Sequence, residues 1–194
     1  MISSLTPFPA LMRTRYLVAL ILAAGVAATA FTRGQSSGAS NATTLIFVRH
    51  AEKADTSRDT QISLAGEERA MALSDVLGDA GIAAIYATPF RRTQQTVKQL
   101  SQRVGVPVTV FDATSAGGAD YGKTYLNEVL SKHRGETVVI AGHSNTLPAM
   151  MRAAGVDDVR PVADFEYDNL YVVTIPQDGK ARIIRARFGA ASAH

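Results

Sequence analysis

Two histidines of this 194-residue chain directly follow short apolar runs, and arginines accompany them. Arg49 and His50 end the run TLIFVRH, and His143 ends the run TVVIAGH. Arg91 and Arg92 begin a predicted helix just after a third apolar run, IAAIYAT. A buried arginine needs an anion or a carboxylate nearby, because burying an unpaired charge is costly. Taken alone, Arg49 and His50 would equally fit the solvent-exposed end of a strand.

These residues could act together if their strands lie side by side in a parallel sheet. The carboxyl ends of parallel strands then meet at one edge, which is where such sheets bind ligands. A helix N-terminus favours anions, and a guanidinium there adds a bidentate grip. Two histidines and two arginines at a single edge would suit a phosphate dianion. The sequence therefore predicts a phosphate site at this edge of the sheet.

The elements that must position these residues follow from the alternation of two apolar patterns. Short apolar runs, typical of strands buried on both faces, lie at 44–50, 82–88, 107–113 and 137–143. Segments predicted to be helical follow these runs, at 63–80, 91–105, 123–134 and 147–155. Two further runs flank the turn PQDGK and predict a hairpin over 169–175 and 181–188. The alternation predicts an α/β fold with three α/β/α layers, a mainly parallel central sheet and a C-terminal β-hairpin.

The N-terminal residues have the composition of an export signal. An apolar run at 16–31 follows two arginines and contains small residues, Ala-Thr-Ala, at 28–30. The run is short for a membrane-spanning helix, which needs about 20 residues, and an uncleaved signal anchor is the alternative. We divide the chain into an export signal or signal anchor (1–30), a flexible linker (31–43) and a main domain (44–194). The protein is expected to be exported, to the periplasm or the extracellular space, and a retained anchor would hold it at the membrane.

Composition excludes several classes of function. The formal net charge is +3, and it falls to +1 without the two arginines of the predicted signal, so the charge gives no argument for nucleic-acid binding. The chain has no cysteine, which excludes disulfides, thiolate metal sites and cysteine nucleophiles. No compact histidine–carboxylate spacing typical of a metal site is present, and no metal is expected.

Three blocks of the sequence, LIFVRHAEK, ATPFRRTQQT and VVIAGHSNT, resemble the histidine phosphatase superfamily in its phosphoglycerate-mutase-like branch. The resemblance runs from about Thr44 to the end of the chain, and it includes ISLAGEERA, similar to the family's Leu-Thr-x-x-Gly helix start. The family's Arg-His-Gly is Arg49-His50-Ala51 here. Counting along the second block matches the family's arginine to Arg92 rather than to its neighbour.

The resemblance implies that His50 attacks phosphorus and becomes a phosphohistidine, which water then hydrolyses. Arg49, Arg92 and His143 would hold the phosphoryl oxygens and neutralise their charge, so that neither a metal nor another cofactor is needed. The residues expected to contact the substrate are Arg49, Arg92, His143, Lys53 and Ser144. Lys53 would equally fit a salt-bridged rim.

The general acid that protonates the leaving oxygen is the part of the site that the sequence leaves open. Many members of the family carry a glutamate between the second block and the second histidine. In this chain Asp112 ends the third predicted strand and so best approaches the same edge of the sheet. A role as a helix or turn cap is the alternative for Asp112. The other acids of the interval fit solvated positions: Asp120, Glu128 and Glu136.

The expected function is hydrolysis of phosphate monoesters or phosphohistidine through an intermediate on His50. A non-catalytic phosphate-binding module on the same fold is the alternative. A phosphomutase is a further alternative, which is disfavoured because the sequence does not identify a general acid. The expected partners are a phosphorylated small molecule, an envelope sugar phosphate or a phosphoprotein, with no nucleic acid, and with a membrane only if the signal is retained.

Overall fold

The computed structural model describes residues 42–111 and 120–192 of the chain. The predicted export signal, most of the linker and Asp112 lie outside the described residues. None of the helices in the described ranges is long and apolar enough to cross a membrane.

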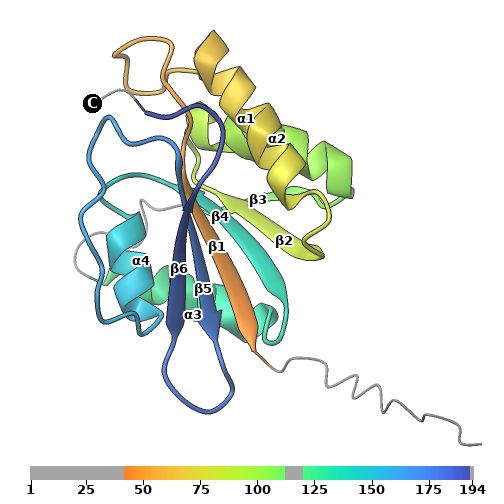
Figure 1. Ribbon diagram of the computed structural model, residues 1–194, viewed down its shortest axis with the longest axis vertical. Helices are drawn as coiled ribbons and strands as arrows, with labels where there is room; N and C mark the ends of the chain where they lie inside the picture. The colour runs from red at the N-terminus through yellow and green to blue at the C-terminus, as the bar shows by residue number, and fades with distance from the viewer. Residues whose placement is uncertain (1–41, 112–119, 193–194) are drawn as a thin grey trace, which may run out of the picture. The chain divides into compact units, whose positions relative to one another are not determined.

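A six-stranded sheet forms the centre of the domain, in the order β3-β2-β4-β1-β5-β6 (Figure 1). The first four strands in the sequence are mutually parallel, β5 runs antiparallel beside β1, and β6 closes the hairpin with β5. This confirms the predicted sheet and hairpin. The strands are β1 (Thr43–Arg49), β2 (Ile82–Ala87), β3 (Val108–Val110), β4 (Thr137–Gly142), β5 (Asn169–Ile175) and β6 (Arg182–Arg187).

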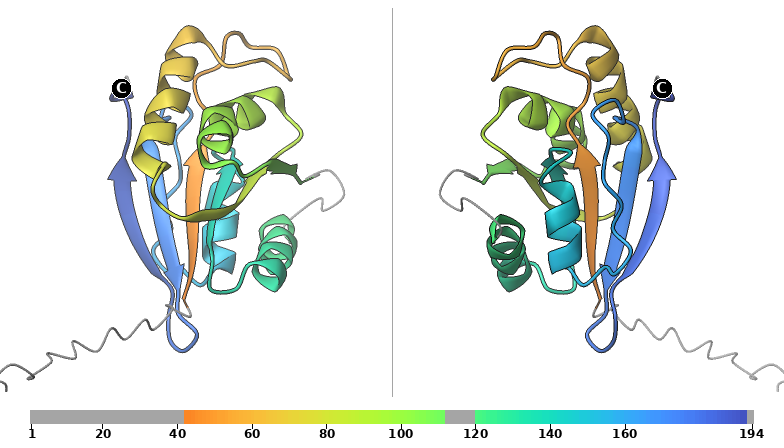
Figure 2. Two further views of the ribbon diagram at one scale, coloured as in Figure 1. Left: turned by 90° about the vertical axis from the view of Figure 1, so that its right-hand side faces the viewer. Right: turned by 90° about the vertical axis from the view of Figure 1, so that its left-hand side faces the viewer.

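Two pairs of helices cover opposite faces of this sheet, which gives the three predicted layers (Figure 2). One pair consists of α1 (Leu64–Leu77) and α2 (Arg91–Val104). The other consists of α3 (Tyr121–Lys132) and α4 (Leu147–Ala153). All four helices lie within the predicted segments or within two residues of them.

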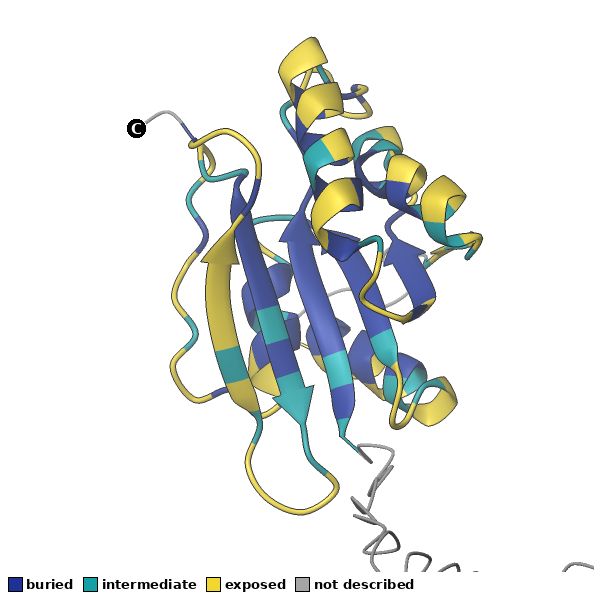
Figure 3. Ribbon diagram, turned by 45° about the vertical axis from the view of Figure 1, so that its right-hand side comes forward, coloured by how far each residue is buried: buried dark blue, intermediate teal, exposed yellow. Residues whose placement is uncertain are grey.

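Strand β1 is buried on both faces, as its continuous apolar run predicts (Figure 3). Leu45 and Phe47 pack with the α3–α4 side of the core, and Ile46 and Val48 pack with the α1–α2 side. Alternate side chains of a strand point to opposite faces, so such a strand must be apolar at every position. β1 is thereby fixed in the middle of the sheet, and its carboxyl end carries Arg49 into the site.

Helix α1 has a narrower buried face than its apolar content suggests. Leu73 and Leu77 are fully or almost fully buried, but Leu64 is 80% exposed and Met71 50% exposed. The helix begins at Ser63, whose hydroxyl accepts a hydrogen bond from the backbone N–H of Gly66, as an N-cap does.

Candidate active site

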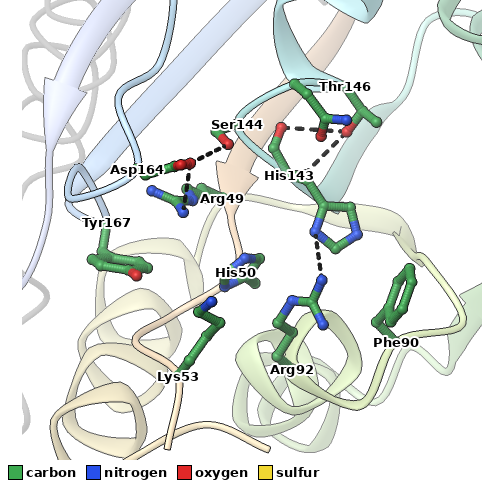
Figure 4. Close-up of a pocket in the computed structure, with 11 residues that line it drawn as sticks. Arg49, His50, Lys53, Phe90, Arg92, His143, Ser144, Thr146, Asp164 and Tyr167 are labelled. Atoms are coloured by element: carbon green, nitrogen blue, oxygen red, sulfur yellow. Dashed lines mark hydrogen bonds and ion pairs between the residues drawn. The ribbon is translucent and has the colours of Figure 1, made fainter. Parts of the chain in front are cut away.

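A cavity of about 440 Å³ lies at the carboxyl ends of β1 and β4, at the edge predicted for the site (Figure 4). It brings together every predicted site residue except Asp112, which lies outside the described residues: Arg49, His50, Lys53, Arg92, His143 and Ser144. The cavity also contains residues that the sequence analysis did not assign to the site: Phe90, Asn145, Thr146, Asp164 and Tyr167.

His50 is held as a neutral ring with one nitrogen free. Its backbone N–H donates to the carbonyl of Gly142, which ties the end of β1 to β4. Nδ1 lies 2.8 Å from the carbonyl oxygen of Ala51. A carbonyl only accepts hydrogen bonds, so the ring proton is on Nδ1 and the lone pair is on Nε2. Burial, and then the charges of Arg49 and its neighbours, lower the pKa of His50 to about 3.

His143 is also neutral, and a chain of hydroxyls fixes its ring. Arg92 Nη2 lies 3.5 Å from Nδ1 of His143, and Thr88 Oγ1 lies 3.0 Å from Nε2. Since a guanidinium only donates, Nδ1 is the acceptor and Nε2 carries the proton toward Thr88. The Thr88 hydroxyl in turn donates to Thr93 Oγ1 over 2.8 Å, because the Thr93 hydroxyl donates to the carbonyl of Phe90. Burial and the two arginines lower the pKa of His143 to about 4.

Arg49 is almost fully buried and is held by the connection between α4 and β5. Nη1 donates to the carbonyl of Ala163 over 2.8 Å, and Nη2 lies 3.4 Å from Oδ1 of Asp164. The guanidinium stacks on Tyr167, 4.4 Å from the ring centre, a favourable cation–π geometry. Its Nε is buried without a partner among the described residues. Arg49 therefore retains a donor for a ligand.

Arg92 repeats this pattern beside His143. Nη1 donates to the carbonyl of Arg58 over 2.8 Å, and the guanidinium stacks 4.4 Å from the centre of the Phe90 ring. Its Nε is likewise buried without a partner in the described part of the chain. Burial lowers the pKa of both arginines, because desolvation disfavours the charged form. A bound oxyanion would satisfy both donors.

Thr96 joins the first two sequence blocks. Its hydroxyl donates to the carbonyl of Arg92 over 2.7 Å and accepts from the backbone N–H of Ala51 over 2.8 Å. Thr96 is completely buried, so both bonds are shielded from water. The hydroxyl fixes the turn that follows His50 relative to the helix that carries Arg92.

Glu52 and Lys53 follow His50 but have different roles. Glu52 does not line the cavity; its carboxylate forms an ion pair with Arg69 at 2.6 Å. The Lys53 side chain is exposed at the rim of the cavity. A side chain at Gly66 would approach the Glu52 carbonyl to 2.7 Å, so glycine lets α1 pack against this segment.

Asp164 is the carboxylate among the residues that line the cavity. Besides Arg49, it contacts Ser144, whose hydroxyl donates to Oδ1 over 2.8 Å. The Asp164 side chain is 92% exposed, and Figure 4 shows it beyond Arg49 as seen from His50. The sequence signal for Tyr167 is the segment FEYDNLYV, in which an aromatic residue precedes a predicted strand. No sequence signal marks Asp164.

The described residues contain no group of three histidine or acidic side chains arranged to hold a metal ion. The positive charge of the cavity comes instead from Arg49, Arg92 and Lys53. The arrangement can therefore bind a phosphate group with its own side chains and present a neutral histidine to the phosphorus.

Comparison with known sequences supports the resemblance stated above. The family model described as histidine phosphatase superfamily (branch 1) matches residues 45–114. A search of curated proteins finds no significant match.

Solved structures share the fold over most of the chain. A mycobacterial glucosyl-3-phosphoglycerate phosphatase is 16% identical, with a TM-score of 0.60, over 73% of this chain and 97% of its own. A phosphoserine phosphatase from Entamoeba histolytica is 12% identical, with a TM-score of 0.57, over 77% and 98%. SixA from Agrobacterium tumefaciens is 22% identical, with a TM-score of 0.58, over 77% and 99%. The segment matched by the family model contains Arg49, His50 and Arg92 at the carboxyl edge of this shared fold, so residues 45–114 match the histidine phosphatase superfamily (branch 1) in the part of the chain that carries three of the predicted site residues.

Proposed function

We propose that the protein is a phosphatase that hydrolyses phosphate monoesters or phosphohistidine through a phosphohistidine intermediate on His50. The observation that carries this proposal is the state of His50. Its Nδ1–H donates to the Ala51 carbonyl, which leaves Nε2 with the lone pair, and the ring lines a cavity with two guanidinium groups whose buried Nε–H donors have no partner among residues 42–111 and 120–192. A nucleophile must be unprotonated and oriented, and both conditions are met here.

The first half of the reaction moves the phosphoryl group to the enzyme. The lone pair on Nε2 of His50 attacks phosphorus while the bond to the leaving group breaks. Arg49 and Arg92 donate to the phosphoryl oxygens and stabilise the charge that they carry in the transition state. Because the bound phosphate is an anion, it favours proton uptake by His143, which would then donate from Nδ1 to a third oxygen.

The second half of the reaction releases the group to water. Water attacks phosphorus, the P–N bond breaks, and inorganic phosphate leaves. The Ala51 carbonyl keeps the proton of His50 on Nδ1 throughout, so that Nε2 returns with its lone pair available. No step needs a metal ion, because the cationic side chains supply the electrostatic stabilisation.

The substrate is proposed to be a phosphorylated small molecule or a phosphorylated protein side chain outside the cytoplasm. The structural neighbours are named for phosphorylated small molecules, glucosyl-3-phosphoglycerate and phosphoserine, which supports the first class. SixA, assigned as a phosphohistidine phosphatase, supports the second. The export signal expected at 1–30 supports the compartment.

The experiment that tests the proposal is a phosphatase assay on residues 31–194 with His50→Ala as the comparison. The panel contains an aryl phosphate, sugar phosphates, phosphoserine and a phosphohistidine protein. Wild type should hydrolyse at least the aryl phosphate and should acquire an acid-labile, base-stable radioactive label from a labelled ester. His50→Ala should lose both. His133→Ala serves as the matched control, since that ring contacts Tyr86 and Glu136 outside the cavity. Turnover or labelling that persists in His50→Ala would refute the mechanism.

A further inference from the structure

The mechanism above names no residue that protonates the leaving oxygen. Among the described residues, Asp164 is placed to act as this general acid. Among the described residues that line the cavity, Asp164 is the one with an acidic side chain. Its Oδ1 accepts from Ser144 over 2.8 Å and lies 3.4 Å from Nη2 of Arg49. Both contacts hold the carboxylate, which is 92% exposed, at the solvent-facing rim of the cavity.

Asp164 lies beyond Arg49 as seen from the nucleophile His50, which bears on where a leaving group would depart (Figure 4). In Figure 4, Ser144 and Asp164 lie beyond Arg49 as seen from His50. In an in-line displacement the leaving oxygen is opposite the attacking nitrogen. A phosphoryl group held by Arg49 between His50 and this rim would therefore turn its leaving oxygen toward Asp164.

The proton of Asp164 would come from solvent, since the Asp164 carboxylate is exposed and a phosphate bound to Arg49 would repel its charge. The Arg49 guanidinium is shared by the Asp164 carboxylate and two backbone carbonyls. When a phosphate dianion binds to the same guanidinium, two negative groups lie close together. Such repulsion is relieved when one of them takes up a proton, as in paired carboxylates. Substrate binding would thereby protonate the carboxyl group next to the leaving oxygen.

We propose that Asp164 is the general acid of the proposed phosphatase reaction, and this inference rests on that function. In the first step, the bond from His50 Nε2 to phosphorus forms and the bond from phosphorus to the leaving oxygen breaks. The proton of the Asp164 carboxyl group passes to that oxygen, which leaves as an alcohol. In the second step, water attacks phosphorus and gives its proton to the Asp164 carboxylate. Phosphate leaves, and both residues return to their starting state.

The experiment compares an alkyl phosphate with an aryl phosphate whose leaving group departs without a proton. The measured quantity is kcat/KM, because it reports the steps up to departure of the leaving group. Asp164→Asn should lower kcat/KM for the alkyl phosphate by about a hundredfold or more and should barely change it for the aryl phosphate. Vanadate inhibition should persist, which would show that the phosphate site is intact.

Two further variants make the result specific. Asp157→Asn is the matched control, since this exposed acid belongs to the same connection and pairs only with Lys180 among the interactions described. This control should leave kcat/KM unchanged for both the alkyl and the aryl phosphate. Asp112→Asn tests the residue that the sequence favoured, and it should not show the leaving-group dependence if Asp164 is the acid.

Three outcomes would overturn the inference. An equal loss on both substrates in Asp164→Asn would mean damaged binding. If Asp164→Asn leaves kcat/KM for the alkyl phosphate unchanged and binds vanadate more tightly, Asp164 only competes with phosphate for Arg49. A selective alkyl loss in Asp112→Asn instead would assign the proton to Asp112. Failure of the proposed function is distinguishable from all of these, because wild type would then hydrolyse neither substrate.

Discussion

Acidification should destabilise the folded protein through the two histidines of the site, because both are buried without charge. The pKa of His50 is about 3 in the folded chain, against an ordinary value of 6.5 for histidine. Below pH 6.5 the unfolded chain takes up a proton at this position that the folded chain does not. Stability is therefore complete above that pH and is lost as pH falls toward the folded pKa.

The size of the loss follows from the difference in pKa. Each unit is about 1.4 kcal/mol, so His50 should cost about 2 kcal/mol of stability on going from about pH 7.5 to about pH 5. His143, whose pKa is about 4, should add to the loss in the same direction. It is less buried than His50, so its share should be smaller. A loss of this size is a large fraction of the stability of a typical domain, about 5–15 kcal/mol.

The assay is urea unfolding of residues 31–194 at both pH values in phosphate-free buffer. Wild type is compared with His50→Asn, which removes the titrating group while keeping a polar side chain. The drop in unfolding free energy on acidification should be about 2 kcal/mol smaller in His50→Asn than in wild type. His133→Asn is the control and should not show this relief. If wild type and His50→Asn lose equal stability, His50 is not held neutral, and the argument for a preformed nucleophile is wrong.

Three other expectations can be measured directly. Activity should survive exhaustive chelation by EDTA, because arginine side chains carry the charge of the site; loss of activity that zinc or magnesium restores would contradict this. Thr96→Val should lower stability by about 1–3 kcal/mol in urea unfolding and should also reduce kcat, since it leaves the Ala51 N–H unpaired next to His50; full activity would mean that the turn does not need this bond. N-terminal sequencing of the protein from its native envelope should begin after Ala30; a retained Met1 would indicate the anchor instead.

The parts of the site on β1, β4 and α2 could be predicted because regular structure fixes where their ends lie. A run such as TLIFVRH is apolar at every position only if the strand is covered on both faces. Parallel strands then end at a common edge, which places His50 and His143 at that edge, and the pairing of β1 with β4 brings them together. The same reasoning placed Arg92, since α2 begins where β2 ends. The family resemblance added the chemical roles.

The connection from α4 to β5 carries a different kind of information, which sequence patterns do not express. It has no repeating periodicity, and its contacts to Arg49 span more than a hundred residues of sequence, as with Asp164 at a separation of 115. Tyr167 lies only two residues before β5, so its proximity to Arg49 depends on β5 pairing with β1. That antiparallel neighbour could not be inferred from a hairpin alone, because a hairpin can join either side of a sheet. Arg49, which would hold the phosphate, is thus positioned by a connection that the sequence patterns did not predict. Substitutions in this connection should therefore alter phosphate affinity through Arg49, even at residues that do not contact the substrate.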